Sequence, residues 1–373
     1  MNATPLLAEH EALGATLTDF AGWQMPLRYT SDVAEHHAVR RAAGLFDLTH
    51  MGEVAVVGPQ AALALDHALV GSFQDLAVGR ARYSMLCQED GAVLDDVVVY
   101  RLAQDQLLVV ANAANAEVVR AELEARAAGF EAQVRDVSAD TTLLAVQGPK
   151  ALVVVQAVAP GQESTLEEMP YYGCAVVRVL GQDVLVARTG YTGEDGFEIY
   201  ASNGQAVELW RTLLEVGGPV GLVPAGLAAR DSLRLEAGMP LYGNELDRTT
   251  TPFEAGLGRV VRFDKTGPDG APVDFVGRAA LQSRKGAEPA RVLVGLEGLG
   301  RRAARAGYPV LRGEVTVGHV TSGAPSPTLG HPVALAYVTP EVSVAGTELS
   351  VDVRGRPEPF RVEPLPFYRR PKA

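Results

Sequence analysis

The feature that most restricts the fold of this 373-residue sequence is a change of pattern near residue 283. Before that point, strand-like apolar runs alternate with helix-like segments, a pattern typical of an α+β fold. After the polar break at 283–289, almost every apolar run is short and is bounded by glycine or proline. Closely spaced short strands predict a small β-barrel or sandwich. We therefore expect an α+β region over residues 1–282 and a C-terminal β-barrel domain over residues 283–373.

Within the α+β region, one short pattern occurs twice. The strand-like run Val54–Val57 is followed by Gly58-Pro59 and a helix-like segment to about Val70. The run Leu143–Val146 is likewise followed by Gly148-Pro149 and a helix-like segment. Proline is favourable just inside a helix start, because its missing N–H would be unpaired there anyway. The repeat predicts a duplicated α+β module. Coincidence is the alternative, because the pattern is short and is repeated only once.

A helix is expected shortly after the N-terminus. Asp32 followed by Glu35 resembles a capping box, in which two side chains three residues apart bond to backbone N–H groups at the helix start. This helix is expected to run to Ala43. Its adjacent histidines, His36 and His37, have no histidine partner four residues away, so we do not expect them to bind a metal.

The composition disfavours some classes of function. The chain has 33 basic and 45 acidic residues, a net charge of −12. This balance argues against a nucleic-acid-binding surface, which needs clustered lysine and arginine. The two cysteines, Cys87 and Cys174, are too few for a disulfide framework or a cysteine-based zinc site, and they favour a reducing compartment. With no signal-peptide pattern and no bilayer-length apolar run, we expect a cytoplasmic protein.

Familiar catalytic motifs are absent from the sequence. It contains no phosphate loop, dinucleotide loop, nucleophile elbow or H-E-x-x-H metal helix, which disfavours nucleotide-driven and covalent reactions. One remaining candidate is Asp95-Asp96, which interrupts a strand-like run so that alternation sends the two carboxylates to opposite faces. If that strand is central, one carboxylate enters an apolar interior and needs a partner or a ligand. A strand end in a turn after Gly91 is the alternative.

A glycine-rich stretch at 188–200 joins two strand-like runs and contains three glycines, which permit positive φ and a close approach of backbone to a ligand. In the second run, Phe197 and Ile199 are expected to face a core, which points Glu198 to the opposite side of the strand. A carboxylate held on a rigid strand can accept bonds from a pair of N–H donors. The alternative is an ordinary β-hairpin with a solvated acidic loop.

A helix expected from Pro224 to Glu236 carries Arg230 and Arg234 one turn apart. Because the neighbouring residues are small, a guanidinium on this helix can closely approach an anion or a ring carbonyl. Ion pairs within the helix, with Asp231 or Glu236, are the alternative.

Six blocks of the sequence stand in an order and at a spacing that are too specific for chance similarity. They are residues 19–26 (DFAGWQMP), 44–52 (GLFDLTHMG), 94–96 (LDD), 190–198 (GYTGEDGFE), 226–238 (GLAARDSLRLEAG) and 241–244 (LYGN). Together they resemble the glycine cleavage system T-protein family, the aminomethyltransferases, over nearly the whole chain.

The resemblance implies a three-lobed cloverleaf of two α+β lobes, interleaved in sequence within residues 1–282, and a C-terminal β-barrel. The implied reaction transfers the methylene of aminomethyl-lipoyl H-protein to tetrahydrofolate as co-substrate. Its products are 5,10-methylenetetrahydrofolate, ammonia and dihydrolipoyl H-protein. No metal or nucleotide is implied, and the system partners would be the lipoylated H-protein, glycine decarboxylase and dihydrolipoyl dehydrogenase. No nucleic-acid or membrane partner is implied.

The resemblance also implies roles for individual residues. Glu198 would accept the ring N–H and exocyclic amine of the pterin, and Arg230 would donate to the ring carbonyl. Asp96 matches an essential aspartate that would relay the proton lost as the folate amine becomes nucleophilic. The remaining folate-pocket positions are Met51, Tyr83, Val98, Tyr100, Asn112, Tyr172 (or its neighbour Tyr171), Tyr191 and Arg369. Of these, Arg369 at the C-terminus matches least securely, and its neighbour Tyr368 is the alternative there.

Three other classes of function compete with this reading. A folate-binding iron–sulfur assembly factor of the same fold would carry a Lys-Gly-Cys-Tyr-x-Gly-Gln-Glu block where this chain has residues 188–195, and neither cysteine lies in such a block. A folate-dependent demethylating domain of dimethylglycine or sarcosine dehydrogenases would be fused to a flavin domain with a dinucleotide loop. A scaffold would not bind tetrahydrofolate at all.

Overall fold

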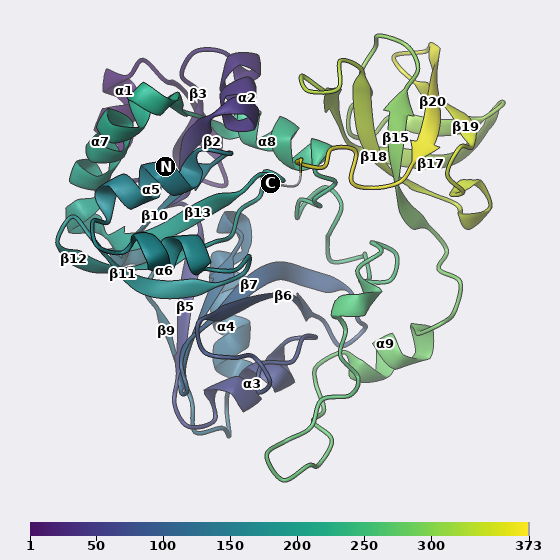
Figure 1. Cartoon of the computed structure of the whole chain (residues 1–373). Coiled ribbons are helices and arrows are strands. Elements are labelled where there is room, and N and C mark those ends of the chain that lie inside the picture. Colours follow the sequence, from purple (N-terminus) through teal and green to yellow (C-terminus); the bar gives the residue numbers. More distant parts are fainter. Residues whose placement is uncertain (372–373) are drawn as a thin grey trace. The chain divides into compact units, whose positions relative to one another are not determined.

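The computed structural model describes residues 1–371 (Figure 1). The chain divides into two compact units. Unit 1 comprises residues 1–65, 73–83 and 97–231, and unit 2 comprises residues 66–72, 84–96 and 232 onward. The α+β class and the C-terminal β-barrel are confirmed. The boundary at residue 282 and the three-lobed arrangement stay predictions.

The larger sheet of unit 1 has six strands in the order β11-β12-β13-β10-β4-β14. One face of this sheet carries the apolar core of the unit together with α5 (Ala151–Val158) and α7 (Ala206–Gly217). The core includes Phe197, Ile199 and Trp210, so the alternate residues of β13 point to the other face. The strand bounds are β4 Ala43–Asp47, β10 Thr141–Gln147, β11 Cys174–Val179, β12 Gln182–Ala187, β13 Gly196–Ser202 and β14 Leu222–Pro224.

A second sheet has five strands in the order β6-β7-β8-β5-β9. The antiparallel pairing of β5 with β8 and of β8 with β7 aligns Glu53, Val110 and Val98 across the sheet. Tyr100 follows Val98 by two residues and therefore shares that face. The strand bounds are β5 Gly52–Val57, β6 Arg80–Cys87, β7 Val93–Ala103, β8 Gln106–Ala111 and β9 Gln133–Asp136.

The N-terminal segment forms a small sheet in the order β1-β3-β2. Helix α2 ends at Arg41, and Ala43, which was predicted to be its last residue, instead begins β4. The elements of this segment are β1 Asn2–Ala3, α1 Leu7–Ala12, β2 Thr16–Phe20, β3 Trp23–Arg28 and α2 Asp32–Arg41. The other helices are α3 Ala61–Ala68, α4 Ala116–Arg126, α6 Glu163–Glu168, α8 Leu227–Glu236 and α9 Arg278–Arg284.

The predicted capping box at α2 is wrong in its residues. The N-cap is Ser31 rather than Asp32, and its side chain accepts the N–H three residues further on, at 3.1 Å. Glu35 does not bond back to the cap. Its buried carboxylate instead accepts three backbone N–H groups, from Tyr29-Thr30 at 2.7 and 2.8 Å and from Gly226 at 2.9 Å. Glu35 thus ties the start of α2 to the segment that leads into α8.

Both copies of the repeated strand–Gly-Pro–helix pattern fold as predicted. The first is β5 followed by α3, and the second is β10 followed by α5. Gly58 and Gly148 have φ values of 143° and 133°. A Cβ atom at either position would lie only 2.3 or 2.5 Å from a backbone carbonyl oxygen, of Glu131 or Ala42 respectively. The same steric demand for glycine therefore occurs in both copies.

Unit 2 contains a closed barrel in the order β15-β18-β17-β16-β19-β20. The four predicted strands are confirmed, but the sequence pattern missed β16 and β20, because prolines begin both strands and a further proline lies within β20. The bounds are β15 Val292–Gly298, β16 Pro309–Arg312, β17 Val315–Pro325, β18 Pro332–Val338, β19 Glu348–Asp352 and β20 Pro357–Glu363.

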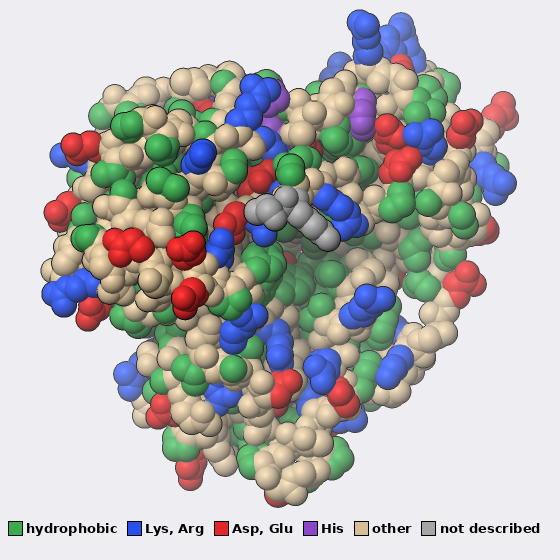
Figure 2. All heavy atoms as spheres, viewed as in Figure 1, with side chains coloured by type: hydrophobic (Ala, Val, Ile, Leu, Met, Phe, Trp, Pro, Cys, Tyr) green, Lys and Arg blue, Asp and Glu red, His purple; other side chains and the backbone are tan. Residues whose placement is uncertain are grey.

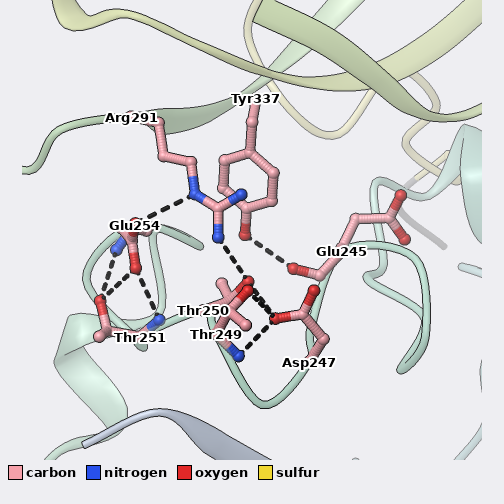
Figure 3. Close-up of polar contacts among 8 residues, drawn as sticks. All are labelled: Glu245, Asp247, Thr249, Thr250, Thr251, Glu254, Arg291 and Tyr337. Carbon is pink, nitrogen blue, oxygen red and sulfur yellow. Dashed lines mark hydrogen bonds and ion pairs between the residues drawn. The ribbon is translucent and has the colours of Figure 1, made fainter. Parts of the chain in front are cut away.

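Polar contacts within unit 2 fasten the start of the barrel to the 245–254 loop (Figure 3). Arg291 stacks over the ring of Tyr337 at 4.5 Å and bonds to Glu254 at 3.1 Å and Thr250 at 2.9 Å. The hydroxyl of Tyr337 donates to the carbonyl oxygen of Glu245 at 2.7 Å. The loop is therefore held by a stacked guanidinium and by hydrogen bonds together.

The surface is mixed in charge. On the face shown in Figure 2, lysine and arginine side chains are interspersed with aspartate and glutamate. Among residues 1–371, none of the helices is both long enough and apolar enough to cross a bilayer.

The Glu35 contacts predict a large effect on stability. We expect Glu35→Ala to lower the free energy of unfolding by about 2–4 kcal/mol, because three backbone N–H groups lose their acceptor. Urea unfolding followed by circular dichroism measures this change. Glu117→Ala, which removes an exposed partner of Arg120 in α4, is the matched control and should leave unfolding unchanged. A Glu35 variant as stable as the control would contradict the assignment.

Candidate functional site

The glycine-rich loop between β12 and β13 is held by two arginines. Arg40 in α2 bonds to Glu194 at 3.0 Å and to the carbonyl oxygen of Thr192 at 2.7 Å, and the side chains of this ion pair are almost fully buried. Arg188 holds Asp195 through two bonds of 2.9 and 2.6 Å. The two loop acids therefore shape the turn, and the interpretation as a solvated acidic loop is wrong.

The buried side chain of Gln147 explains two of the loop glycines. Its Nε2 donates to the carbonyl oxygen of Thr189 at 3.0 Å, and its Oε1 accepts from the hydroxyl of Thr192 at 2.9 Å. A Cβ atom added at Gly190 or Gly196 would lie only 2.0 or 2.3 Å from the end of this side chain. Both positions therefore require glycine, because the loop lies against the Gln147 side chain, which two hydrogen bonds hold in place.

Glu198 lies on β13 as alternation predicted. Its neighbours Phe197 and Ile199 are fully buried in the core on one face of the sheet, and Glu198 points to the other face with part of its surface exposed. The residues paired with it across the sheet are Ala145 on β10 and Ala187 on β12. Because both are small, the carboxylate stands on an open part of the sheet.

The carboxylate of Glu198 is held at one oxygen. Its Oε2 accepts hydrogen bonds from the hydroxyls of Thr189 and Tyr100, the latter at 3.1 Å. The hydroxyl of Tyr200 donates to that of Tyr100, also at 3.1 Å. Burial is the main cause that raises the pKa of both tyrosines well above the usual range, so they remain donors. Within residues 1–371, the other oxygen, Oε1, accepts no hydrogen bond.

Arg230 supplies a cation beside this carboxylate. It lies in the first turn of α8, which begins at Leu227 rather than at the predicted Pro224. Its guanidinium stacks over the ring of Tyr191 at 4.9 Å. Burial lowers the pKa of Arg230, while the charge of Glu198 opposes that shift. Glu198, Arg230, Tyr191 and Tyr100 are therefore brought together, as predicted.

His50 is a neighbour of this group that sequence reasoning did not single out. The ring is 3% exposed, packs edge-on against Phe20 at 5.3 Å, and its Nδ1 has no hydrogen-bond partner within residues 1–371. Burial, reinforced by the nearby charge of Arg230, lowers the pKa of His50 to about 4. The ring is therefore neutral near pH 7 and adds no second cation. Its position in the 44–52 block was the available signal.

The other predicted pocket residues differ in exposure and in the unit to which they belong. Tyr172 has a left-handed backbone with φ of 61°, and its ring packs edge-on against the exposed Tyr171 at 4.8 Å. Arg369 is exposed and belongs to unit 2. The residues of this set that lie in unit 1 and are partly exposed are Met51, Tyr83, Val98, Asn112 and Tyr172.

The two aspartates of β7 face opposite ways, as predicted. Asp95 is fully buried and Asp96 is partly exposed, and both lie inside a strand that begins at Val93, so the alternative of a strand end is wrong. In unit 2, the hydroxyl of Tyr242 donates to the carbonyl oxygen of Val93 at 3.3 Å. Burial, followed by the charge of Asp95, raises the pKa of Tyr242. The catalytic role of Asp96 stays a prediction.

The candidate site is not marked by a metal cluster within the described residues. Within residues 1–371, no three histidine, cysteine, aspartate or glutamate side chains are arranged to hold a metal ion. A shallow pocket of about 470 Å³ lies elsewhere, between residues 57–59 and 130–133. The polar geometry around Glu198, rather than cavity volume, identifies the candidate site.

Most of the chain matches two protein families. Residues 6–265 match the family described as the GCVT N-terminal domain, and residues 291–369 match the glycine cleavage T-protein C-terminal barrel domain. The chain belongs to the glycine cleavage T-protein family, which confirms the resemblance inferred from the sequence blocks.

Relatives and a solved structure match over the full length. The chain is 57% identical to the aminomethyltransferase of Saccharopolyspora erythraea, covering 98% of both chains. It is 55% identical to that of Streptomyces coelicolor, covering 100% of this chain and 99% of the relative. The crystal structure of glycine cleavage system aminomethyltransferase T from Bartonella henselae matches with a TM-score of 0.91 and 40% identity, covering 99% and 98% of the two chains.

The contact between the loop and Gln147 gives a prediction. We expect Gly190→Ala to lower the free energy of unfolding by about 1–3 kcal/mol, because the new Cβ displaces a side chain held by two hydrogen bonds. Chemical denaturation measures this change. In a Gln147→Ala background the same substitution should cost clearly less, because the atoms it meets are gone. An equal cost in both backgrounds would exclude Gln147 as the reason for glycine.

Proposed function

We propose how this aminomethyltransferase of the glycine cleavage system works. It takes the methylene of aminomethyl-lipoyl H-protein and transfers it to tetrahydrofolate. The products are 5,10-methylenetetrahydrofolate, ammonia and dihydrolipoyl H-protein. The observation that carries the proposal is that Arg230 lies close enough to feel the charge of Glu198 and lies over the ring of Tyr191, within a chain of this family.

The residues around Glu198 fit a pterin. A pterin edge presents a ring N–H and an exocyclic amine side by side, and a carboxylate can accept from both. Glu198 has one oxygen that no protein donor occupies within residues 1–371, so acceptor capacity is available. The guanidinium of Arg230 lies over the ring of Tyr191 and makes no hydrogen bond within residues 1–371, so its N–H groups can donate to a ring carbonyl. Tyr191 offers an aromatic surface next to them.

Asp96 is proposed as the catalytic group. When bound, tetrahydrofolate supplies the amine nitrogens that attack the methylene carbon. Two folate nitrogens each form a C–N bond to the methylene carbon and each lose a proton, while the bonds from that carbon to the departing nitrogen and to the lipoyl sulfur break. One proton leaves with the nitrogen as ammonia, and the other ends on the sulfur of the dihydrolipoyl group. The Asp96 carboxylate is partly exposed and is therefore able to accept and relay one of these protons. Its share of the reaction is this proton transfer.

The physiological setting follows from the same proposal. Lipoylated H-protein delivers the aminomethyl group, and glycine decarboxylase and dihydrolipoyl dehydrogenase are the other members of the system. The reaction requires no metal or nucleotide. Cys87 and Cys174 are buried and not joined in a disulfide, which supports a reducing, cytoplasmic location. The iron–sulfur assembly alternative is not favoured, because the full-length relatives are aminomethyltransferases.

The role of Asp96 can be tested by substitution. We expect Asp96→Asn to lower turnover by on the order of a hundredfold or more, because the amide cannot accept the proton. Folate affinity and the unfolding midpoint should stay close to those of the unmodified protein. A steady-state assay of methylenetetrahydrofolate formation measures turnover, and near-normal turnover would remove Asp96 from the catalytic role.

The role of Glu198 is tested by binding. We expect Glu198→Gln to weaken tetrahydrofolate binding by about 1–3 kcal/mol, because the amide presents a donor where the pterin edge also presents donors. Calorimetric titration measures the affinity. Glu117→Gln alters an exposed carboxyl that pairs with Arg120 on α4, and it is the control, expected to bind normally. Unchanged affinity of the Glu198 variant would defeat the assignment.

The whole activity is decided by one assay. Aminomethylated H-protein is mixed with the enzyme, with and without tetrahydrofolate, and methylenetetrahydrofolate and ammonia are measured. We expect both products to form in equal amounts only when tetrahydrofolate is present. Tetrahydrofolate binding without transfer would instead favour a folate-binding factor, and absence of binding would favour a scaffold.

A further inference from the structure

Three hydroxyls form a continuous chain behind Glu198, and the third of them lies outside the residues that the resemblance placed in the pocket. Thr189 and Tyr100 donate to Oε2 of Glu198, and Tyr200 donates to Tyr100. Tyr200 is on the same face of β13 as Glu198, two residues further along. Tyr200 is buried, with 7% of its surface exposed, so it is not itself open to a ligand.

Counting protons shows what Tyr200 does. A hydroxyl has one proton to donate, and Tyr100 and Thr189 lie 3.0 Å apart, so either can donate to the other. If Thr189 donates to Tyr100, Glu198 loses one of its two donors. In the structure the Tyr100 hydroxyl accepts its hydrogen bond from Tyr200, so it does not need to accept one from Thr189. Both remaining protons, those of Tyr100 and Thr189, are then directed to Glu198.

A buried carboxyl, that of Glu53, acts electrostatically on Tyr200. Glu53 lies on β5, is fully buried, and neither of its carboxyl oxygens has a hydrogen-bond partner within residues 1–371. Burial, reinforced by the charge of Asp136, raises the pKa of Glu53 well above its usual range. Burial thus favours the protonated form of Glu53 over the carboxylate.

We propose that Tyr200 is a positioning residue for folate recognition. By donating to Tyr100 it keeps two hydroxyls directed at Oε2, which fixes the carboxylate and leaves Oε1 facing the ligand. The inference rests on the proposed role of Glu198 as the acceptor of the pterin donors. Charge-assisted hydrogen bonds are about twice as strong as neutral ones, so their loss weakens the orientation of Glu198 directly.

The test is Tyr200→Phe, which removes one hydroxyl and keeps the ring. We expect tetrahydrofolate affinity, measured by calorimetry, to fall about threefold to tenfold, as for the loss of one hydrogen bond. The KM for tetrahydrofolate should rise by a similar factor while kcat stays nearly unchanged, because the lost interaction serves binding. Tyr29→Phe is the matched control, since it removes a hydroxyl bonded to His10 at 2.9 Å in the same unit. It should bind normally.

A double-mutant cycle separates positioning from general loosening of the fold. In a Glu198→Gln background, Tyr200→Phe should change the affinity less than twofold, because its effect passes through Glu198. Effects that multiply independently would overturn the inference, as would a Tyr200 variant that binds like the Tyr29 control. If Glu198→Gln itself leaves affinity unchanged, the proposed role of Glu198 fails, and the inference that rests on it fails for that separate reason.

Discussion

The carboxylate of Glu198 must be satisfied on a sheet face where its paired residues, Ala145 and Ala187, offer it no polar side chain. Partial removal of a charge from water is costly unless hydrogen bonds replace the lost solvation. Thr189 and Tyr100 supply those bonds at one oxygen only. The arrangement satisfies the charge without closing the group to a ligand. A carboxylate bonded at both oxygens would be equally stable but would have little capacity left for recognition.

In the loop that precedes Glu198, the other two carboxylates are paired with arginines. Glu194 and Asp195 precede it by a few residues and would compete for the same donors if they were open. Arg40 and Arg188 hold them instead, and these two ion pairs also fix the path of the loop. The side chain of Gln147 also supports the loop, and it fits because Gly190 and Gly196 have no Cβ atom that would contact it. Selectivity within the stretch thus comes from pairing the other acids.

Local rules predicted those parts of the molecule that depend on local chemistry. Alternation placed Glu198 opposite Phe197, and closely spaced short strands gave the barrel. The errors arose where a distant partner decides. Glu35 was assigned to a local cap, but its carboxylate also accepts a hydrogen bond from a backbone N–H 191 positions away, that of Gly226. Tyr200 gave no signal, because a tyrosine in an apolar strand normally packs, and its hydroxyl acquires a role only when Tyr100 is brought to it from another sheet.

The two arginines of α8 show why sequence alone could not complete the site. Arg230 and Arg234 lie one turn apart on α8 and have similar neighbours in the sequence, yet their contacts in the folded protein differ. Arg234 is 1% exposed, and its N–H groups bond to Glu245 at 2.9 Å and Ser322 at 2.7 Å, so they are engaged in holding unit 2 together. The guanidinium of Arg230 has no hydrogen bond or ion pair within residues 1–371, and its central carbon lies over the ring of Tyr191, 4.9 Å from the ring centroid. This contact leaves its N–H donors unused. Arg230 is therefore the arginine suited to a ligand, a distinction set by tertiary contacts that the shared helical pattern does not encode.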